Sequence, residues 1–260
     1  MFEGRRVPSE ISTSNVRGPA AGLELTAVTA AILAGGLGSR LRPAVSGHPK
    51  ALANIGERPF LTYLFDQLLA AGAREVVLCT GYLGDQIRMI LGESYNTLRL
   101  NYSRESTPLG TAGALRLALP LLNSNPVLVM NGDSYCDANI REFWFWHDGR
   151  HSNATLLLTK VFDTERFGQV KVDTDGKVTD FREKGSGQGS GWINAGIYLL
   201  NRDLLEEIPV NRAVSLEREI FPSWIGRGLC GFQSEARFID IGTPEAYAKA
   251  QSFFATGLSR

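Results

Sequence analysis

The stretch Leu33-Ala34-Gly35-Gly36-Leu37-Gly38-Ser39-Arg40-Leu41-Arg42 follows directly after the apolar run Val28–Ile32, which predicts a buried strand. A strand that leads into a glycine-rich turn presents backbone N–H groups against which a polyphosphate can lie. The three glycines carry no Cβ and can adopt positive φ. Arg40, Arg42 and, a short distance further on, Lys50 add cations at the same end of the strand. We interpret this segment as a binding site for a nucleoside triphosphate.

Neither common glycine motif accounts for this segment. A Walker loop needs a glycine, four residues and then Gly-Lys-Ser/Thr, and the sequence has no such run. The dinucleotide fingerprint needs a third glycine where Leu41 stands. The alternative to a phosphate site is a tight turn between a strand and a loop, with solvated arginines.

Composition limits the class of protein. The 260 residues are 43% hydrophobic and 21% charged, which is enough for one α/β domain or two small ones. The net charge of zero argues against nucleic acid or an anionic membrane as a partner, and the apolar runs are too short to span a bilayer. The three cysteines are Cys79, Cys136 and Cys230; without a Cys-x-x-Cys pair they indicate a reducing compartment, and we expect a cytoplasmic location. We expect residues 1–26 to form a disordered extension, and they lack the apolar region of a secretory signal. We expect residues 27–258 to form a single domain.

Strand and helix patterns alternate along the first half of the chain, which favours a parallel, doubly wound sheet. We expect strands at Glu75–Thr80, Leu98–Tyr102 and Val127–Met130, and helices at Phe60–Ala71, Asp85–Leu91 and Gly113–Leu121. The second half is less regular. It predicts strands at Ala154–Val161, Gln169–Val172, Lys177–Phe181 and Ile193–Leu200, and a helix at Ser215–Trp224. Ligands of such sheets bind at the carboxyl ends of the strands.

When Pro43 and Pro49-Lys50-Ala51-Leu52 are included, the glycine segment resembles the signature of the sugar-phosphate nucleotidylyltransferases. These enzymes make NDP-sugars from an NTP and a sugar 1-phosphate. The resemblance implies a Rossmann-like, doubly wound, mostly parallel sheet flanked by helices, and the sequence lacks the hexapeptide repeats of a β-helix extension. It also implies the nucleotide-binding residues, namely Leu33, Ala34, Gly35, Gly36, Gly38, Ser39, Arg40, Glu105, Gly110, Thr111 and Gly132.

Nucleotidyl transfer places charge on a pyrophosphate leaving group, so a divalent ion is expected, and Mg²⁺ prefers one or two carboxylates together with phosphate and water. Asp133 follows an apolar strand and resembles the metal-binding aspartate of the family; capping of the next helix is the alternative. Asp240 lies before Thr243-Pro244-Glu245, which reads as a helix N-terminus, so capping does not account for it. We expect Asp133 and Asp240 to hold Mg²⁺.

The same resemblance assigns a group of residues to the sugar phosphate, namely Lys50, Gly168, Glu183, Lys184 and Asn194. Arg40 would lie along the β and γ phosphates, Lys50 near the α-phosphate, and Lys184 against the sugar phosphate. With Asp133 and Asp240 these form the expected catalytic set. A solvated Glu183-Lys184 pair and a simple turn at Gly168 are the alternatives. We expect no proton-transferring base, because the histidines are scattered.

Glu105 bears on the choice of base. A carboxylate only accepts hydrogen bonds, and guanine offers two adjacent donors, its N1–H and 2-amino groups. Uracil offers one donor between two carbonyl oxygens, which a carboxylate would repel. Guanine is therefore favoured over cytosine and adenine, and a solvent-facing Glu105 is the alternative.

The short sequence segments around His48, Arg58, Trp192 and Glu217 resemble those of the family branch whose enzymes act on D-glycero-α-D-manno-heptose 1-phosphate with GTP. Mannose- and glucose-1-phosphate enzymes share most of them and remain alternatives. From other classes, we weigh an inactive NDP-sugar-binding regulatory subunit and a Rossmann-type redox enzyme. The sequence leaves a homodimer open.

Overall fold

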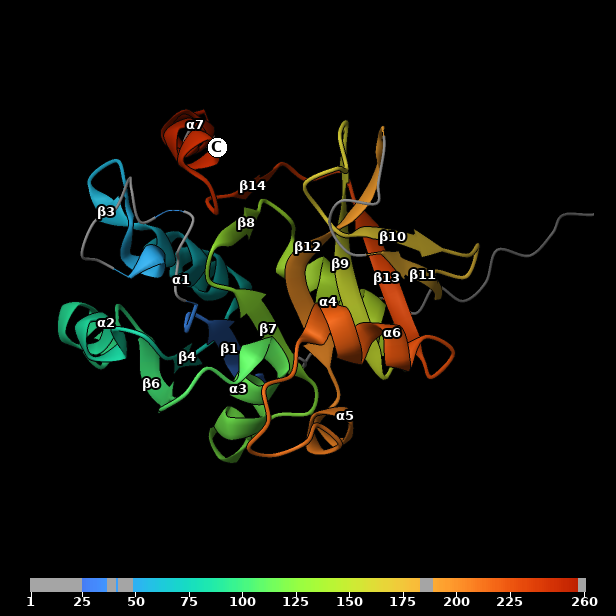
Figure 1. The fold of residues 1–260 in the computed structure, drawn as a ribbon, viewed down its shortest axis with the longest axis horizontal. Coiled ribbons are helices and arrows are strands. Elements are labelled where there is room, and N and C mark those ends of the chain that lie inside the picture. The colour runs from blue at the N-terminus through green and yellow to red at the C-terminus, as the bar shows by residue number, and fades with distance from the viewer. Residues whose placement is uncertain (1–24, 37–40, 42–48, 183–188, 257–260) are drawn as a thin grey trace, which may run out of the picture.

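The computed structural model describes residues 25–36, 41, 49–182 and 189–256. Its central strand, β1 (Ala30–Leu33), lies between β7 (Val127–Asn131) and β4 (Glu75–Thr80) and is parallel to both. Beyond β4, β6 (Leu98–Arg104) continues in the same direction. These four strands come from the alternating first half of the chain, as the sequence predicted. Their carboxyl ends therefore lie along one edge of the sheet (Figure 1).

The second half of the chain extends the sheet with strands of mixed direction. The main strand of this half, β12 (Gly191–Leu200), is antiparallel to β7. The full order is β11-β10-β12-β7-β1-β4-β6-β5, and β9 joins β12 to β13. The remaining strands of the sheet are β5 (Ser94–Tyr95), β9 (Ala154–Val161), β10 (Gln169–Val172), β11 (Val178–Arg182) and β13 (Leu229–Ser234). The α/β fold class with a central parallel sheet is confirmed.

The pairing of β12 with β9 is broken at one place. The register between β12 and β9 shifts between Asn194 and Tyr198, and Gly196 has a φ of 76° there. A Cβ on Gly196 would lie 2.6 Å from Oγ of Ser134 and 2.9 Å from Nδ2 of Asn131. Glycine is therefore required by both backbone conformation and space. Asn194, just before the break, and Asn131, at the end of β7, both donate to the hydroxyl of Tyr198.

Two small pairs of strands lie outside the main sheet. In one of them, β14 (Phe238–Asp240) is antiparallel to β8 (Ser134–Cys136), with Asp240 opposite Ser134. The other joins β2 (Asn54–Ile55) to β3 (Arg58–Pro59). The first pair brings the end of the chain back to the residues that follow β7.

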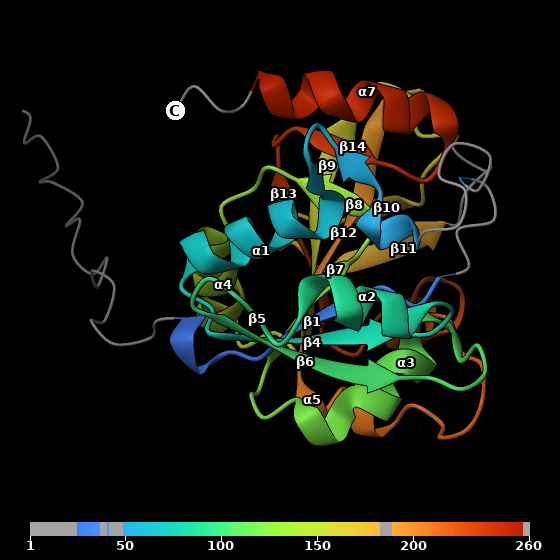
Figure 2. The same ribbon diagram turned by 90° about the vertical axis from the view of Figure 1, so that its left-hand side faces the viewer.

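Helices cover both faces of the sheet (Figures 1 and 2). Ile32 of β1 packs into one core with Phe65 and Phe143, and its neighbour Ala31 packs into a second core with Leu115 and Phe221. Alternate residues of one strand thus contact opposite layers. The helices are α1 (Phe60–Ala71), α2 (Gly84–Leu91), α3 (Gly110–Ala118), α4 (Ile140–Gly149), α5 (Arg202–Glu206), α6 (Phe221–Trp224) and α7 (Pro244–Ala255). In the described part of the chain, no helix is long and apolar enough to cross a membrane.

Some helix boundaries differ from the sequence prediction. Helix α3 begins at Gly110, three residues earlier than expected. Gly110 has a φ of 71°, and a Cβ there would lie 2.5 Å from the carbonyl oxygen of Val214, so a side chain would not fit. The helix expected at Ser215–Trp224 is a π-helical segment, η4 (Leu216–Ile220), followed by the short α6. Short 3₁₀ turns occur at Leu25–Ala27, Lys50–Leu52 and Leu119–Leu121.

Candidate active site

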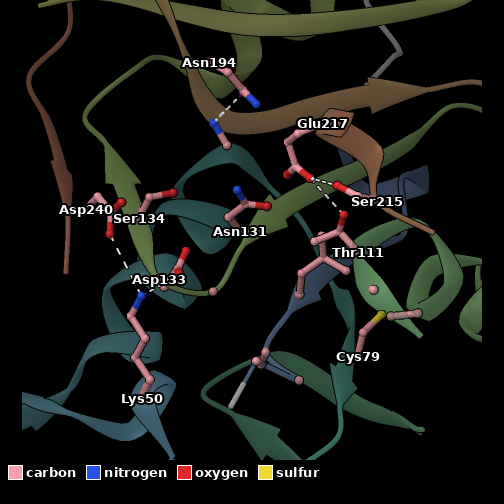
Figure 3. Close-up of a pocket in the computed structure, with 18 of the residues that line it drawn as sticks. Lys50, Cys79, Thr111, Asn131, Asp133, Ser134, Asn194, Ser215, Glu217 and Asp240 are labelled. Carbon is pink, nitrogen blue, oxygen red and sulfur yellow. Dashed lines mark hydrogen bonds and ion pairs between the residues drawn. The ribbon is translucent and has the colours of Figure 1, made fainter. Parts of the chain in front are cut away.

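A cleft of about 470 Å³ opens at the carboxyl ends of the central strands. Figure 3 shows two groups of side chains in it. Lys50, Asp133 and Asp240 lie at one end, and Thr111, Ser215 and Glu217 lie at the other; Asn131 is between them. The two groups come from different elements, because β7 leads to Asp133 and η4 carries Glu217.

The ammonium group of Lys50 connects the two aspartates. Its Nζ atom lies 2.6 Å from Oδ2 of Asp133 and 4.0 Å from Oδ1 of Asp240. The Lys50 side chain is 13% exposed, so the contacts are partly shielded from water. Oδ1 of Asp240 also accepts a hydrogen bond from the backbone N–H of Gly242. A Cβ on Gly242 would lie 2.6 Å from that oxygen and 3.2 Å from Nζ of Lys50, so glycine leaves room for both groups.

The Asp133 and Asp240 carboxylates fit a divalent cation. Both carboxylates lie within 4.0 Å of the Lys50 ammonium group. The position of that ammonium group marks a place where the two carboxylates stabilise positive charge. Within the described ranges, no cluster of three or more His, Cys, Asp or Glu side chains could hold a metal ion. Mg²⁺ needs no such cluster, because phosphate oxygens and water supply its other ligands. Substrate would therefore complete the coordination at this end of the cleft.

Glu105 lies at the opposite side of the sheet edge, after β6. Its Oε2 atom accepts a hydrogen bond from the backbone N–H of Leu109, and Oε1 lies against the backbone of Gly35 and Gly81. A Cβ on Gly81 would lie 2.6 Å from Oε1. Burial raises the pKa of Glu105, and the Leu109 hydrogen bond partly opposes the shift. Glu105 therefore lines the cleft and is partly buried there.

The cleft also brings together other residues predicted for the nucleotide. The backbone N–H of Gly132 donates to the carbonyl of Leu33, which ties the end of β7 to the end of β1. Gly110 lies at the first turn of α3, and the hydroxyl of Thr111 donates to Glu217. Ala34, Gly35 and Gly36 also line the cleft.

On the β12 side, Gly168 and Asn194 lie next to each other. The carbonyl of Gly168 accepts a hydrogen bond from the backbone N–H of Asn194. The Asn194 side chain donates to the hydroxyl of Tyr198 at 2.9 Å and accepts from the N–H of Gly196. Both predicted sugar residues line the cleft. The predicted residues Gly38, Ser39, Arg40, Glu183 and Lys184 lie outside the described residues.

Sequence reasoning missed a polar group at the base of the cleft. Glu217 accepts hydrogen bonds from the hydroxyls of Thr111 and Ser215, at 2.9 and 3.0 Å. Asn131 and Tyr198 complete the group. Ser215-Leu216-Glu217 stood out only as part of a resemblance, because a serine at a helix start is normally a local cap and a glutamate in the first turn is normally a solvated, favourable charge. Only the fold shows that this carboxylate points into the cleft.

The fold and the site define a transferase of nucleotidyl groups. Residues 29–257 match the family model described as "Nucleotidyl transferase", and the chain belongs to this family. It is 38% identical over 223 residues to D-glycero-alpha-D-manno-heptose 1-phosphate guanylyltransferase of Aneurinibacillus thermoaerophilus, covering 85% of this chain and 96% of the relative. It is 34% identical to mannose-1-phosphate guanylyltransferase of Mycobacterium tuberculosis, covering 89% of this chain and 66% of the longer relative.

Solved structures agree with the sequence relatives. HddC from Yersinia pseudotuberculosis superimposes with a TM-score of 0.79 at 33% identity, covering 87% of this chain and 99% of HddC. A second structure of HddC, in complex with GMP-PN, gives a TM-score of 0.77. The sequence prediction of a sugar-1-phosphate nucleotidylyltransferase is confirmed, and enzymes of this family generally use a divalent metal ion.

Proposed function

We propose that the enzyme transfers the guanylyl group of GTP to D-glycero-α-D-manno-heptose 1-phosphate. An oxygen of the sugar phosphate attacks the α-phosphorus of GTP, the bond from that phosphorus to the bridging oxygen breaks, and pyrophosphate leaves. The observation that carries the choice of GTP is the Glu105 carboxylate in the cleft, beside the backbone of Gly35 and Gly81. The heptose is favoured by the relative from Aneurinibacillus, which this chain covers almost completely.

The residues of the cleft have different roles in the proposed reaction. The backbone of Gly35 and Gly36 would lie along the nucleotide, and Lys50 would place its positive charge between the two substrates. Asp133 and Asp240 would hold Mg²⁺, which neutralises phosphate charge when bound. The nucleophile is already anionic, so no side chain needs to remove a proton. Most of the rate enhancement would come from alignment of the two phosphates.

The test is a pyrophosphate-release assay with four NTPs and with the 1-phosphates of the heptose, mannose and glucose. We expect the highest kcat/KM with GTP and the heptose. Preference for mannose 1-phosphate would move the assignment to the other relatives, and GTP as the poorest nucleotide would contradict the role of Glu105.

Glu105→Gln sharpens the test of the base. A glutamine offers one acceptor and one donor, so the KM for GTP should rise at least tenfold and discrimination against UTP should weaken. The raised pKa of Glu105 predicts that the KM for GTP rises as the pH falls, and that this begins at a higher pH than for an ordinary glutamate. In Glu105→Gln this pH dependence should be lost. Glu93→Gln, which removes an exposed carboxylate paired with Arg88, is the control.

Mg²⁺ as the specific ion, a cytoplasmic location, a homodimer and the boundaries of the domain stay predictions.

A further inference from the structure

The hydroxyl of Tyr198 connects three side chains of the cleft. It accepts hydrogen bonds from Nδ2 of Asn194 at 2.9 Å and from Nδ2 of Asn131 at 3.5 Å, and it donates to Oε1 of Glu217 at 3.5 Å. Tyr198 is completely buried, and burial raises the pKa of its hydroxyl well above the usual value. The hydroxyl therefore keeps its proton and holds the three side chains in a fixed arrangement.

Glu217 is also held from its other oxygen. Oε2 receives the hydroxyl protons of Thr111 and Ser215. Each of these hydroxyls in turn accepts a backbone N–H: that of Leu216 for Thr111, and that of Arg218 for Ser215. The protons of both hydroxyls are thus directed at Glu217, and the carboxylate cannot rotate without breaking several hydrogen bonds.

Two acceptor atoms remain available at this place. Oδ1 of Asn131 is buried and has no hydrogen-bond partner among the described residues. Among the residues that the structure describes, Oε1 of Glu217 receives only the long contact from Tyr198. Both residues line the cleft, and Figure 3 shows their side chains pointing toward one another. Because a buried acceptor without a donor is unfavourable, the arrangement is suited to a ligand that brings donors.

The order of the strands decides which substrate brings them. Asn131 ends β7, beside β12 with Asn194, whereas Glu105 follows β6, on the other side of β1 and β4. With Glu105 at the base and Asn194 at the sugar, as the proposed function has them, the base and the sugar would lie at opposite sides of the cleft. Asn131 lies on the side of β12, and Glu217 accepts the hydroxyl of Tyr198, which belongs to β12. A sugar ring with adjacent hydroxyls would supply two donors at neighbouring positions.

We propose that Asn131 and Glu217 are specificity-determining residues that accept hydrogen bonds from two adjacent hydroxyls of the sugar ring. This inference rests on the proposed function, because it needs a sugar 1-phosphate as the second substrate. It adds a recognition role for residues that neither the sequence nor the site's phosphate chemistry requires.

The experiment compares Glu217→Gln with the parent on the heptose 1-phosphate and on its 2-deoxy, 3-deoxy and 4-deoxy analogues. A glutamine of the same size loses the charge, so the KM for the heptose 1-phosphate should rise 10- to 100-fold while the KM for GTP changes less than threefold. On the analogue that lacks the bound hydroxyl, parent and variant should differ less than threefold.

Asn131→Ala provides the second, independent variant. It should raise the KM for the sugar phosphate, and its defect should disappear on the analogue that lacks the adjacent hydroxyl. Glu206→Gln, which removes an exposed carboxylate on α5, is the matched control and should behave as the parent. Thermal melting shows whether each variant is folded.

Three outcomes would overturn the inference. An equal defect on all analogues would indicate a purely structural role, and a rise in the KM for GTP in place of the sugar would move the residues to the nucleotide. If the parent turns over no sugar 1-phosphate with any NTP, the proposed function itself fails, and this inference fails with it.

Discussion

Nζ of Lys50 and Oδ2 of Asp133 lie 2.6 Å apart, although 83 positions separate the two residues in the sequence. The lysine follows the glycine segment, and the aspartate follows β7. Their contact places a cation that follows the glycine segment in the sequence beside a carboxylate of the expected metal site.

Replacing this cation should expose the repulsion that it offsets. In Lys50→Gln the carboxylates of Asp133 and Asp240 would face each other without the ammonium group. We expect a lower melting temperature in EDTA, a larger increase on adding Mg²⁺ than in the parent, and a kcat/KM reduced at least 100-fold. Differential scanning fluorimetry and the pyrophosphate assay measure these effects, with Lys171→Gln on β10 as the control. The same Mg²⁺ shift in variant and parent would contradict a shared site.

The two aspartates should act as a unit. Asp133→Asn and Asp240→Asn each keep the size of the side chain, and the asparagine oxygen at position 240 can still accept the N–H of Gly242. We expect kcat to fall 100-fold or more in each, with the fold retained and little further loss in the double variant. Asp137→Asn, which affects an aspartate paired with Arg237, is the control. Simply additive losses would indicate two separate roles.

Alanine substitutions at two glycines of equal φ distinguish the energetic cost of backbone strain from the cost of steric contact. Gly196 and Gly189 both have a φ of 76°, but a Cβ on Gly189 meets no atom within 4 Å. Gly189→Ala should therefore lose about 1–2 kcal/mol of unfolding free energy from backbone strain alone. Gly196→Ala should lose roughly 1–3 kcal/mol more, because its Cβ would contact Ser134 and Asn131. Urea denaturation measures both. An equal loss in the two variants would contradict the tight packing at Gly196.

The lowered pKa of the buried His147 predicts that the stability of the protein depends on pH. Its Nδ1 atom lies 2.7 Å from Oγ1 of Thr155, and burial lowers the pKa of His147 to about 4. The unfolded chain, where histidine has a pKa near 6.5, binds the proton more readily. The free energy of unfolding should therefore decrease as the pH falls from about 6.5 to about 4, by at most about 3 kcal/mol.

The contribution of this residue is isolated by comparison with His147→Gln, because buried carboxylates also titrate at the acidic end. The difference in unfolding free energy between parent and variant should shrink over the same pH range. A difference that does not change with pH would show that folding leaves the pKa of His147 unshifted.

The sequence predicted the parallel centre of the fold and most of the cleft. Strands such as Glu75–Thr80 are continuous apolar runs between turn residues, a pattern that buried parallel strands impose locally. Asp133 was found because it follows such a strand, and parallel strands deliver their ends to one edge. Glu105 was found through the resemblance to the family, which marks its position as one that contacts the base.

The parts that were missed depend on distant contacts. Strands β8 and β14 have three residues each, too few for a period, and each is stabilised by its pairing with the other. The role of Glu217 depends on Thr111, which precedes it by about a hundred positions. No local pattern reports such a contact, because nothing in the spacing of η4 distinguishes a carboxylate directed inward from a solvated one.

The pairing of β14 with β8 has a consequence for biosynthesis. Asp240 belongs to one of the last strands to leave the ribosome, whereas the glycine segment, Lys50 and Asp133 emerge much earlier. A nascent chain could already bind a nucleotide before Asp240, the second aspartate of the expected metal site, has been synthesised. Catalytic activity would then begin late in synthesis, in a single step, when β14 pairs with β8.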